Sequence, residues 1–258
     1  MVAIITDIRS LFLLGLRGLQ TDSNANRMSK RKLLLLLAML FIFCFTLFSR
    51  FVKLGGMKTA DFAITVKVQE RIDNSSRLRL ARFTGEVMEG ATFFASPMVA
   101  SIGMLLLTML SALSRKKWRW MALAIPILFG LMTLAEIYGK SVVHHPAPPF
   151  FLLKNPTTIF PKYYVQEDYS YPSGHAARAI FLGISIFSYL FFHTSFFKRM
   201  TVKLLISIGI ISYVCLIAVS RIYLGHHWAS DVIAGLLLGG GIGLLTQCIT
   251  LPYNTKRE

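Results

Sequence analysis

Acidic residues and cysteines are scarce in this sequence. Of its 258 residues only 12 are Asp or Glu, against 28 Lys and Arg, which gives a formal net charge of +16. The three cysteines, Cys44, Cys215 and Cys248, lie inside apolar stretches at spacings that match no metal-binding motif, so we expect them to be packing residues. The sequence also contains no internal repeat and no long low-complexity tract. It therefore gives no sign of a repeat array or of a cysteine metal centre.

Apolar runs, in contrast, are long and frequent. Hydrophobic residues make up 54% of the chain, whereas soluble domains contain about 45–50%. A helix needs about 20 residues to cross the hydrocarbon layer of a bilayer. Six runs are long enough: residues 33–52, 90–113, 118–139, 173–193, 201–219 and 228–251. The sequence therefore predicts an all-α, polytopic membrane protein with six transmembrane helices.

The charged residues between the runs indicate the orientation. Basic residues are enriched in short cytoplasmic loops, and the short segment RKKWR, residues 115–119, is basic apart from its tryptophan. Placing it in the cytoplasm puts both termini there and most acidic residues outside. The compact length and short loops favour a prokaryotic cytoplasmic membrane. Because the basic residues flank apolar runs, they suit anionic lipid headgroups, and we expect no nucleic-acid partner.

The predicted organisation has three parts. Residues 1–32 form a cytoplasmic extension, residues 33–251 form the six-helix membrane domain, and residues 252–258 form a cytoplasmic tail. The first run follows KRK but lacks an A-x-A-type cleavage site, which favours an uncleaved signal anchor. We hypothesise that the native protein begins at Met28, because MSKRKLLLLLAML resembles an ordinary start of a membrane protein.

Two segments outside the runs have distinctive patterns. Residues 50–89 alternate apolar and charged residues with helical spacing, which predicts one or two amphipathic helices along the outer interface, or a solvated helical cap. The connection of residues 141–172 is rich in proline and aromatic residues. A long, stiffened connection of this kind is typical of a functional cover over a pocket, although it could also be a simple spacer.

Histidines gather at one face of the predicted bundle. Five of the six lie where four run ends meet on the outer side: His144, His145, His175, His226 and His227. The sixth, His193, lies at the other end of the fourth run, and we assign it no role. Ionisable groups are costly at membrane depth, so their clustering indicates a functional site.

The pair His227 and Asp231 is the strongest candidate for covalent chemistry. Four residues apart at the start of a helix, the two side chains share one face. A carboxylate there can fix the tautomer of the imidazole and make its other nitrogen a better nucleophile. His226 would instead face Ser230, which is a weaker partner.

The segment Pro172-Ser173-Gly174-His175 predicts a turn into a helix. Ser173 is a natural cap, and Gly174 lets a ligand approach the backbone closely. A helix N-terminus favours an anion, and the cations of Lys140 and Arg221 would suit a phosphate. His175, at the same helix start, could protonate a leaving oxygen.

Two charged residues near this segment have structural alternatives. Lys140 lies one helical turn from Glu136 and could simply form an ion pair with it. Arg178, inside the fourth run, could pair with an acid or contribute to the pocket.

Together these residues resemble the signatures of the type 2 phosphatidic acid phosphatase superfamily, which are Lys-x6-Arg-Pro, Pro-Ser-Gly-His and Ser-Arg-x5-His-x3-Asp. The second is intact at residues 172–175, and the third runs from Ser220 to Asp231. In the first, counting from Lys140 leads to Ala147-Pro148, so the arginine is absent. Its loss removes a phosphate clamp worth about 1.5–3 kcal/mol, for which His144 or His145 could substitute.

The resemblance implies a membrane lipid phosphatase domain and a mechanism. A lipid phosphate or pyrophosphate monoester would be hydrolysed at the outer face, without metal or cofactor, through a phosphohistidine. His227 would be the nucleophile, oriented by Asp231, and His175 the acid. The implied phosphate-binding groups are Lys140, Ser173, Gly174 and Arg221.

Other activities and several substrates stay open at this point. The same residues would serve a phosphotransferase that passes the phosphoryl group to another acceptor, and the missing arginine would fit an inactive lipid-binding or transport homologue. The lipid could be an isoprenyl pyrophosphate, phosphatidylglycerol phosphate, phosphatidic acid or a lipid A-type headgroup.

Overall fold

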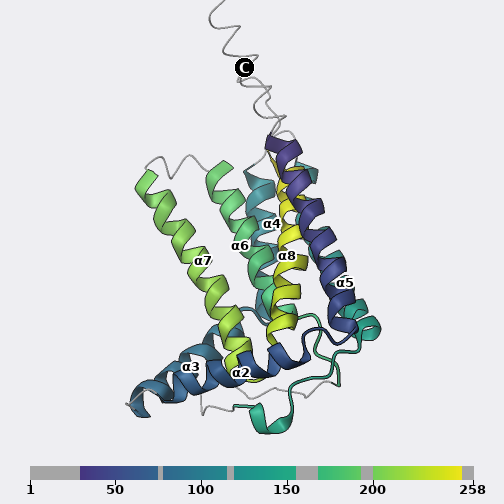
Figure 1. The fold of residues 1–258 in the computed structure, drawn as a ribbon. Coiled ribbons are helices and arrows are strands. Elements are labelled where there is room, and N and C mark those ends of the chain that lie inside the picture. Colours follow the sequence, from purple (N-terminus) through teal and green to yellow (C-terminus); the bar gives the residue numbers. More distant parts are fainter. Residues whose placement is uncertain (1–29, 75–77, 115–118, 155–167, 193–199, 252–258) are drawn as a thin grey trace, which may run out of the picture.

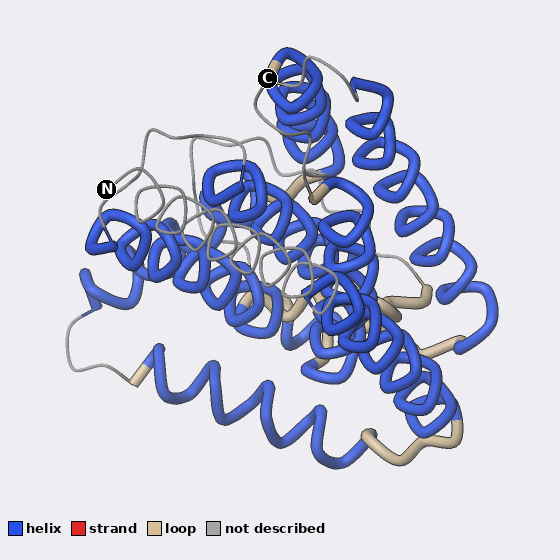
Figure 2. The backbone as a smooth tube through the Cα atoms, turned by 90° about the horizontal axis from the view of Figure 1, so that it is seen from above, coloured by secondary structure: helices blue, strands red, loops and turns tan. Residues whose placement is uncertain are grey.

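The structure is a computed structural model that describes residues 30–74, 78–114, 119–154, 168–192 and 200–251. Within these ranges the chain forms helices and loops and no strand (Figure 2), which confirms the all-α prediction. Met28, residues 1–29 of the predicted extension, the tail and His193 lie outside the described residues, whereas residues 30–32 of the extension belong to the first helix.

Eight α-helices and two short 3-10 helices make up the described part of the chain. They are Lys30–Lys53, α2 (Lys58–Asp73), α3 (Leu78–Phe94), α4 (Pro97–Leu113), η1 (Arg119–Leu123), α5 (Ala124–Val143), η2 (Phe150–Leu152), α6 (Gly174–Phe192), α7 (Met200–Tyr223) and α8 (Ala229–Thr250). Five are long and apolar enough to cross a membrane, and α3 with α4 gives a sixth if this bent pair is one span. The six-span prediction agrees with this count.

The second predicted span is broken near its start. Residues 90–113 form one charge-free run, yet α3 ends at Phe94 and α4 starts at Pro97, with a bend of 51° between them. Proline has no N–H and its ring clashes with the preceding helical turn, so it starts α4 and cannot continue α3. The hydroxyl of Ser96 accepts a hydrogen bond from the Val99 N–H at 3.5 Å, as an N-cap does.

Helices α6 and α8 form the centre of the bundle. In each, 56% of the spanning window is buried, against 6% in α7 and in Lys30–Lys53. Glycines of α8 allow the close contact: a Cβ at Gly235 would lie 2.3 Å from the Ser173 carbonyl oxygen, and one at Gly239 2.2 Å from that of Ala177. These glycines serve helix packing. The approach brings the N-terminal ends of α6 and α8 together.

Helices α2 and α3 lie across one end of the bundle (Figure 1). They occupy the region where one or two helices were predicted, but α2 packs differently from an ordinary amphipathic helix. Its buried positions are Asp61, Thr65 and Gln69, all polar, while Phe62 and Ile64 are exposed. The inward face of α2 is therefore a polar stripe.

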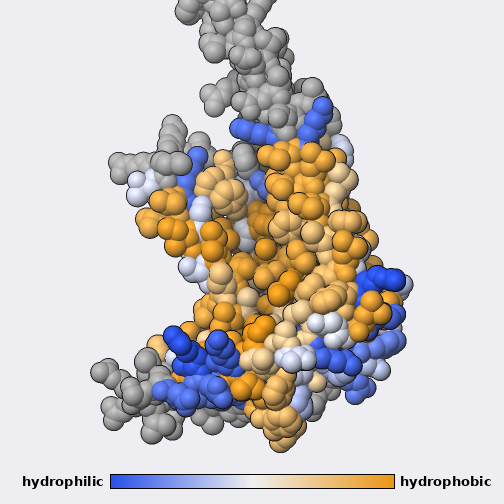
Figure 3. Space-filling model, in the orientation of Figure 1, coloured by the Kyte–Doolittle hydropathy of each residue, from blue (hydrophilic) through white to orange (hydrophobic). Residues whose placement is uncertain are grey.

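The surface and the chain ends fit a membrane-spanning bundle. Apolar side chains cover the middle of the shaft, and hydrophilic ones lie at both ends (Figure 3). The described ends of the chain lie together at the end opposite α2 (Figure 1), where the Arg31 guanidinium donates a 2.7 Å hydrogen bond to the Leu251 carbonyl. The chain thus enters and leaves the bundle on one side, in agreement with the predicted topology.

Candidate active site

The candidate residues come together at the end of the bundle that α2 covers. They lie on the last turns of α5 and α7, on the first turn of α6, and on the turn that leads into α8. Arg221 is close enough to act electrostatically on His175, His226 and His227, and Lys140 acts on His227. The structure therefore gathers at one place the imidazoles and cations that the sequence placed on separate segments.

His227 lies just before α8 and faces Asp231, which is in the first turn of that helix. Nδ1 of His227 lies 3.6 Å from Oδ2 of Asp231, slightly beyond hydrogen-bond range, and both side chains are buried. Burial lowers the pKa of His227 below its usual value, and Arg221 adds to the effect while Asp231 opposes it. The imidazole is therefore neutral at pH 7, and its Nε2 is the nitrogen turned away from the carboxylate.

The neighbouring His226 is a weaker candidate for the same chemistry. Burial, reinforced by Arg221 and His227, lowers the pKa of His226 to about 2, so this ring is also neutral at pH 7. Asp231 lies beside His227, whereas the influences on the pKa of His226 are burial, Arg221 and His227, in line with the sequence-based preference for His227.

Asp231 has further partners that the sequence analysis missed. The Trp228 N–H donates to its Oδ2 at 2.9 Å, and Nδ1 of His145 lies 2.9 Å from its Oδ1. On the other side of this ring, Nε2 of His145 lies 3.8 Å from Oδ2 of Asp61 in α2. Neither histidine of the pair 144–145 is shown as a replacement for the missing arginine: His145 is buried against Asp231, and His144 is exposed and packs edge-on against Tyr169.

At the start of α6, the hydroxyl of Ser173 is buried and unpaired among the described residues, as are those of Thr65, Ser185 and Ser188. The residue is fully buried, its N–H donates to the Asp231 carbonyl at 2.9 Å, and its Oγ has no hydrogen-bond partner among the described residues. Its side chain therefore does not cap the helix, contrary to our expectation. A buried hydroxyl left unpaired costs free energy. A ligand that accepted a hydrogen bond from it would remove this cost.

The missing side chain of Gly174 has a packing role that the sequence did not show. A Cβ at this position would lie 2.0 Å from Oε1 of Glu136. The missing side chain thus makes room for the Glu136 carboxylate, and the structure does not show it opening the backbone to a ligand. That carboxylate accepts a 2.8 Å hydrogen bond from Arg178, whose Nε donates to the Ala95 carbonyl at 3.2 Å. Arg178 therefore pairs with an acid, which was one of its two predicted roles.

The described parts of the α5–α6 connection are anchored over the α7–α8 turn. The Trp228 indole donates to the Pro146 carbonyl at 2.7 Å, and the Lys154 N–H donates to the Leu224 carbonyl at 3.0 Å. Gly225 has a φ of +69°, and a Cβ there would lie 2.2 Å from the Leu152 carbonyl oxygen. Residues 155–167 of this connection lie outside the described residues.

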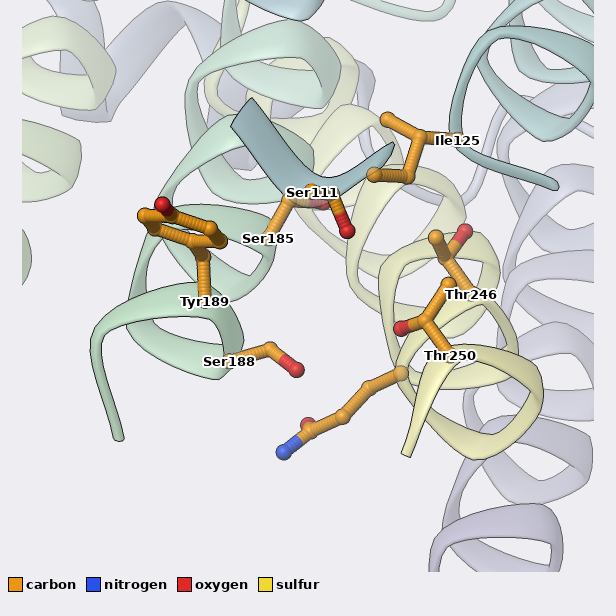
Figure 4. A pocket seen from close by; sticks show the side chains of 8 residues that line it. Ser111, Ile125, Ser185, Ser188, Tyr189, Thr246 and Thr250 are labelled. Atoms are coloured by element: carbon orange, nitrogen blue, oxygen red, sulfur yellow. The ribbon is translucent and has the colours of Figure 1, made fainter. Parts of the chain in front are cut away.

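A cavity at the opposite end of the bundle is not part of this site. It lies between α4, α5, α6 and α8 and is lined by uncharged side chains (Figure 4): Ser111, Ile125, Ser185, Ser188, Tyr189, Thr246, Gln247 and Thr250. Among the described residues that line this cavity there is no cation to bind a phosphate. In the part of the chain that the structure describes, no group of three His, Cys, Asp or Glu is arranged to hold a metal ion.

Residues 120–253, about half of the chain, match the family model of the PAP2 superfamily. The protein belongs to the PAP2 superfamily. The matched segment contains Lys140, the residues 172–175 and the segment from Arg221 to Asp231, so the family match covers the whole set of residues proposed from the sequence.

Two curated relatives have matching segments. One is phosphatidylglycerophosphatase B of Bacillus subtilis (strain 168), 27% identical over 156 residues that cover 60% of this chain and 68% of that protein. Another is an undecaprenyl-diphosphatase of Sulfolobus acidocaldarius, 36% identical over 132 residues, which cover 51% of this chain and 56% of that protein. Both are phosphatases named for lipid phosphates.

A solved structure shows the same fold. The crystal structure of a transmembrane PAP2-type phosphatidylglycerolphosphate phosphatase from Bacillus subtilis has a TM-score of 0.64 and 22% sequence identity. The similarity covers 81% of this chain and 93% of that one. The superposed region is thus larger than the family match and extends beyond the signature-bearing helices.

Asp61 is the site residue that had no sequence signal of its own. It lies in the alternating segment before the family match and is 84 positions from His145, so no motif spacing links the two. The spacing of Asp61, Thr65 and Gln69 places three polar residues on one helical face, but it does not show that this face is buried.

Proposed function

We propose that the protein hydrolyses a phosphate or pyrophosphate monoester of a membrane lipid at the end of the bundle that α2 covers. One observation carries this proposal: the His227–Asp231 pair, His175 and the cations of Arg221 and Lys140 converge there from separate helices. The unpaired hydroxyl of Ser173 lies at the same helix start. Imidazoles, cations and a free donor at one point suit a tetrahedral oxyanion.

The first step forms a phosphohistidine. Nε2 of His227 attacks phosphorus while Asp231 orients the ring and stabilises its developing positive charge. The bond between phosphorus and the lipid oxygen breaks, and His175 donates a proton to that oxygen. In the second step water attacks the phosphohistidine, His175 takes up the proton of the water, and free phosphate leaves.

Stabilisation of the transition state comes from groups around the equatorial oxygens. We assign this role to the cations of Lys140 and Arg221, the hydroxyl of Ser173 and the N–H of Gly174. Preorganised donors and charges of this kind supply most of the rate enhancement in phosphoryl transfer. Each group that the mechanism requires is a side chain or a backbone amide of this chain.

The absent arginine affects the choice of substrate. Ala147 is half-buried in the connection and offers no side-chain donor, so the phosphate is held by fewer cations than the family signature provides. The curated relatives are named for phosphatidylglycerophosphate and undecaprenyl diphosphate. We therefore place phosphatidylglycerol phosphate and isoprenyl diphosphates first among the candidate substrates.

The orientation follows from the predicted topology. With both termini in the cytoplasm, the end covered by α2 faces the outside of the membrane, and phosphate is released there while the dephosphorylated lipid stays in the bilayer. The location of the site at the end opposite the described chain ends supports this proposal.

A phosphate-release assay tests the activity. The full chain is purified in detergent and given a panel of lipid phosphates, with and without chelator, and free phosphate is measured for the wild type, His227→Ala and His144→Ala as the control. Chelator-resistant release that disappears only in His227→Ala supports the proposal. Label transferred to an acceptor lipid would instead identify a phosphotransferase, and a folded wild type without turnover on any lipid of the panel would reject both.

A further inference from the structure

The carboxylate of Asp231 is held on both of its oxygens. Oδ2 accepts the Trp228 N–H at 2.9 Å and faces the His227 ring, while Oδ1 lies 2.9 Å from Nδ1 of His145. Because a carboxylate only accepts hydrogen bonds here, His145 must present its Nδ1–H. Asp231 is fully buried, so these donors determine how it is oriented toward His227.

A second carboxylate lies behind this arrangement. Asp61 accepts the Ser230 N–H at 2.8 Å on Oδ1 and the Ser230 hydroxyl at 2.7 Å on Oδ2. It thereby binds an N–H in the first turn of α8, which has no partner within the helix. Its Oδ2 also lies 3.8 Å from Nε2 of His145. Asp61 is therefore in contact with the residue next to Asp231 and with the ring that binds Asp231.

We propose that His145 and Asp61 are positioning residues for the nucleophile. Asp61, on α2, binds Ser230 at the start of α8 and lies beside the His145 ring. His145 in turn orients Asp231, and Asp231 orients His227. The inference rests on the proposed function, because the group that is positioned is the proposed nucleophile. Residue 61 lies outside the family match at 120–253, so the family signatures do not include it.

Burial makes this arrangement energetically sensitive. Asp61, His145 and Asp231 are each less than a tenth exposed. Without the His145 ring, Oδ1 of Asp231 loses its donor, and two buried carboxylates face each other without a group between them. Leaving a buried charged acceptor unpaired is costly, so Asp231 would turn toward other donors and release its hold on His227.

Substitutions at His145 separate a hydrogen-bonding role from a space-filling one. His145→Phe keeps a ring without the donor, and we expect kcat to fall about 10- to 100-fold, as for partners of an orienting residue. KM should change little, because neither residue touches the phosphate. His145→Gln restores an N–H toward Asp231 and should recover most of the loss. The controls are His144→Phe, on the exposed neighbour, and Glu70→Gln, on the exposed face of α2.

A double-mutant cycle tests whether His145 acts through Asp231. In the Asp231→Asn background, His145→Phe should cost at most about 3-fold, because the contact it supports is already gone. Asp61→Asn should reduce kcat by a smaller factor than His145→Phe, since Asn still accepts the Ser230 N–H. A full, multiplicative loss in the Asp231→Asn background, or a His145→Gln variant as poor as His145→Phe, would overturn the proposal.

A spectroscopic readout makes the test independent of turnover. In protein labelled with ¹⁵N-histidine, the ring resonances of His227 are assigned with His227→Ala. His145→Phe should shift Nδ1 of His227, whereas His144→Phe should leave it in place. If His145→Phe does not fold, Asp61→Asn carries the test and should shift the resonances of His145. Unchanged resonances would refute the positioning role.

The two proposals fail in different ways. An inactive wild type, or a His227→Ala variant that keeps its activity, rejects the proposed function whatever the spectra show. An active wild type with an inactive His227→Ala variant, but with normal kcat and unchanged His227 resonances in His145→Phe, rejects only the positioning role.

Discussion

The two ends of the bundle both hold polar side chains inside an apolar shell, but with different chemistry. At the end covered by α2 the buried groups are ionisable and matched, as in the Glu136–Arg178 pair and the contact of His145 with Asp231. At the other end the cavity is lined by hydroxyls and one amide (Figure 4). Neutral groups of this kind serve contacts between membrane helices. Among the described residues, matched charges and imidazoles distinguish the end covered by α2 from the other end.

The largest effect should come from removing the nucleophile. His227→Ala should reduce lipid phosphate hydrolysis on the order of 1,000-fold or more, because the phosphohistidine can no longer form. Phosphate release by the detergent-purified protein measures this, with Ser188→Ala at the opposite end as the matched control. Equal losses in both variants would break the comparison between the two ends.

Breaking the buried ion pair should have the next largest effect, here on stability. Glu136→Ala leaves Arg178 as an uncompensated buried charge, and we expect the free energy of unfolding to fall by about 3–5 kcal/mol. Unfolding in detergent micelles measures the change, and Glu70→Ala on the exposed face of α2 is the control. A loss as small as that of the control would mean that the pair is solvated in the membrane.

Removing a phosphate-binding cation should have a smaller effect on activity. Arg221→Ala should lower kcat/KM by about 10- to 150-fold, which corresponds to about 1.5–3 kcal/mol for a charge-assisted hydrogen bond. Inhibition by vanadate should weaken in parallel, because vanadate mimics the phosphate. A variant with normal vanadate inhibition would show that Arg221 does not bind the anion.

The pH profile should shift in a defined direction. Burial and Arg221 lower the pKa of His227, so the ring loses its proton at a lower pH than a free histidine, whose pKa is about 6.5. The acid limb of kcat/KM should therefore have its midpoint below about 6.5. Arg221→Ala removes a nearby positive charge and should move the midpoint upward. A wild-type midpoint above the free value would contradict the neutral nucleophile.

The smallest effect should be found in the uncharged cavity. The hydroxyl of Ser188 is buried without a hydrogen-bond partner among the described residues, so Ser188→Ala should change the free energy of unfolding by at most about 1 kcal/mol. Activity should stay the same. A strong loss of phosphate release would show that the two ends of the bundle are coupled.

Sequence reasoning succeeded where the relevant contacts are local. His227 and Asp231 are four residues apart in the sequence, and this short spacing keeps their side chains close although His227 lies just before the start of α8. The break before Pro97 has a local signal, because proline cannot continue a helix. We did not predict it, because residues 90–113 form one uninterrupted charge-free run. The sequence did not show that Ser173 Oγ lacks a partner among the described residues or that the Glu136 carboxylate lies beside Gly174, because both depend on which neighbour occupies the space beside α6.

Contacts between distant segments had no such local signal. Asp61 and Ser230 are 169 positions apart, and His145 and Asp231 are 86 apart. Neither spacing is a helical or strand period, so only the packing of α2 and of the α5–α6 connection against α8 brings these residues into contact. From the sequence we considered His145 only as a substitute for the missing arginine at position 147. The structure instead places its ring against Asp231.

The sequence by itself determined that this chain forms apolar spanning helices and that imidazoles and cations gather at one face, because helix formation and membrane insertion depend on neighbouring residues. Tertiary structure alone decided that α2 turns a polar stripe inward and that the oxygens of Asp231 face separate partners. The physical reason is that a buried carboxylate is oriented by whichever donors packing brings within about 3 Å of it.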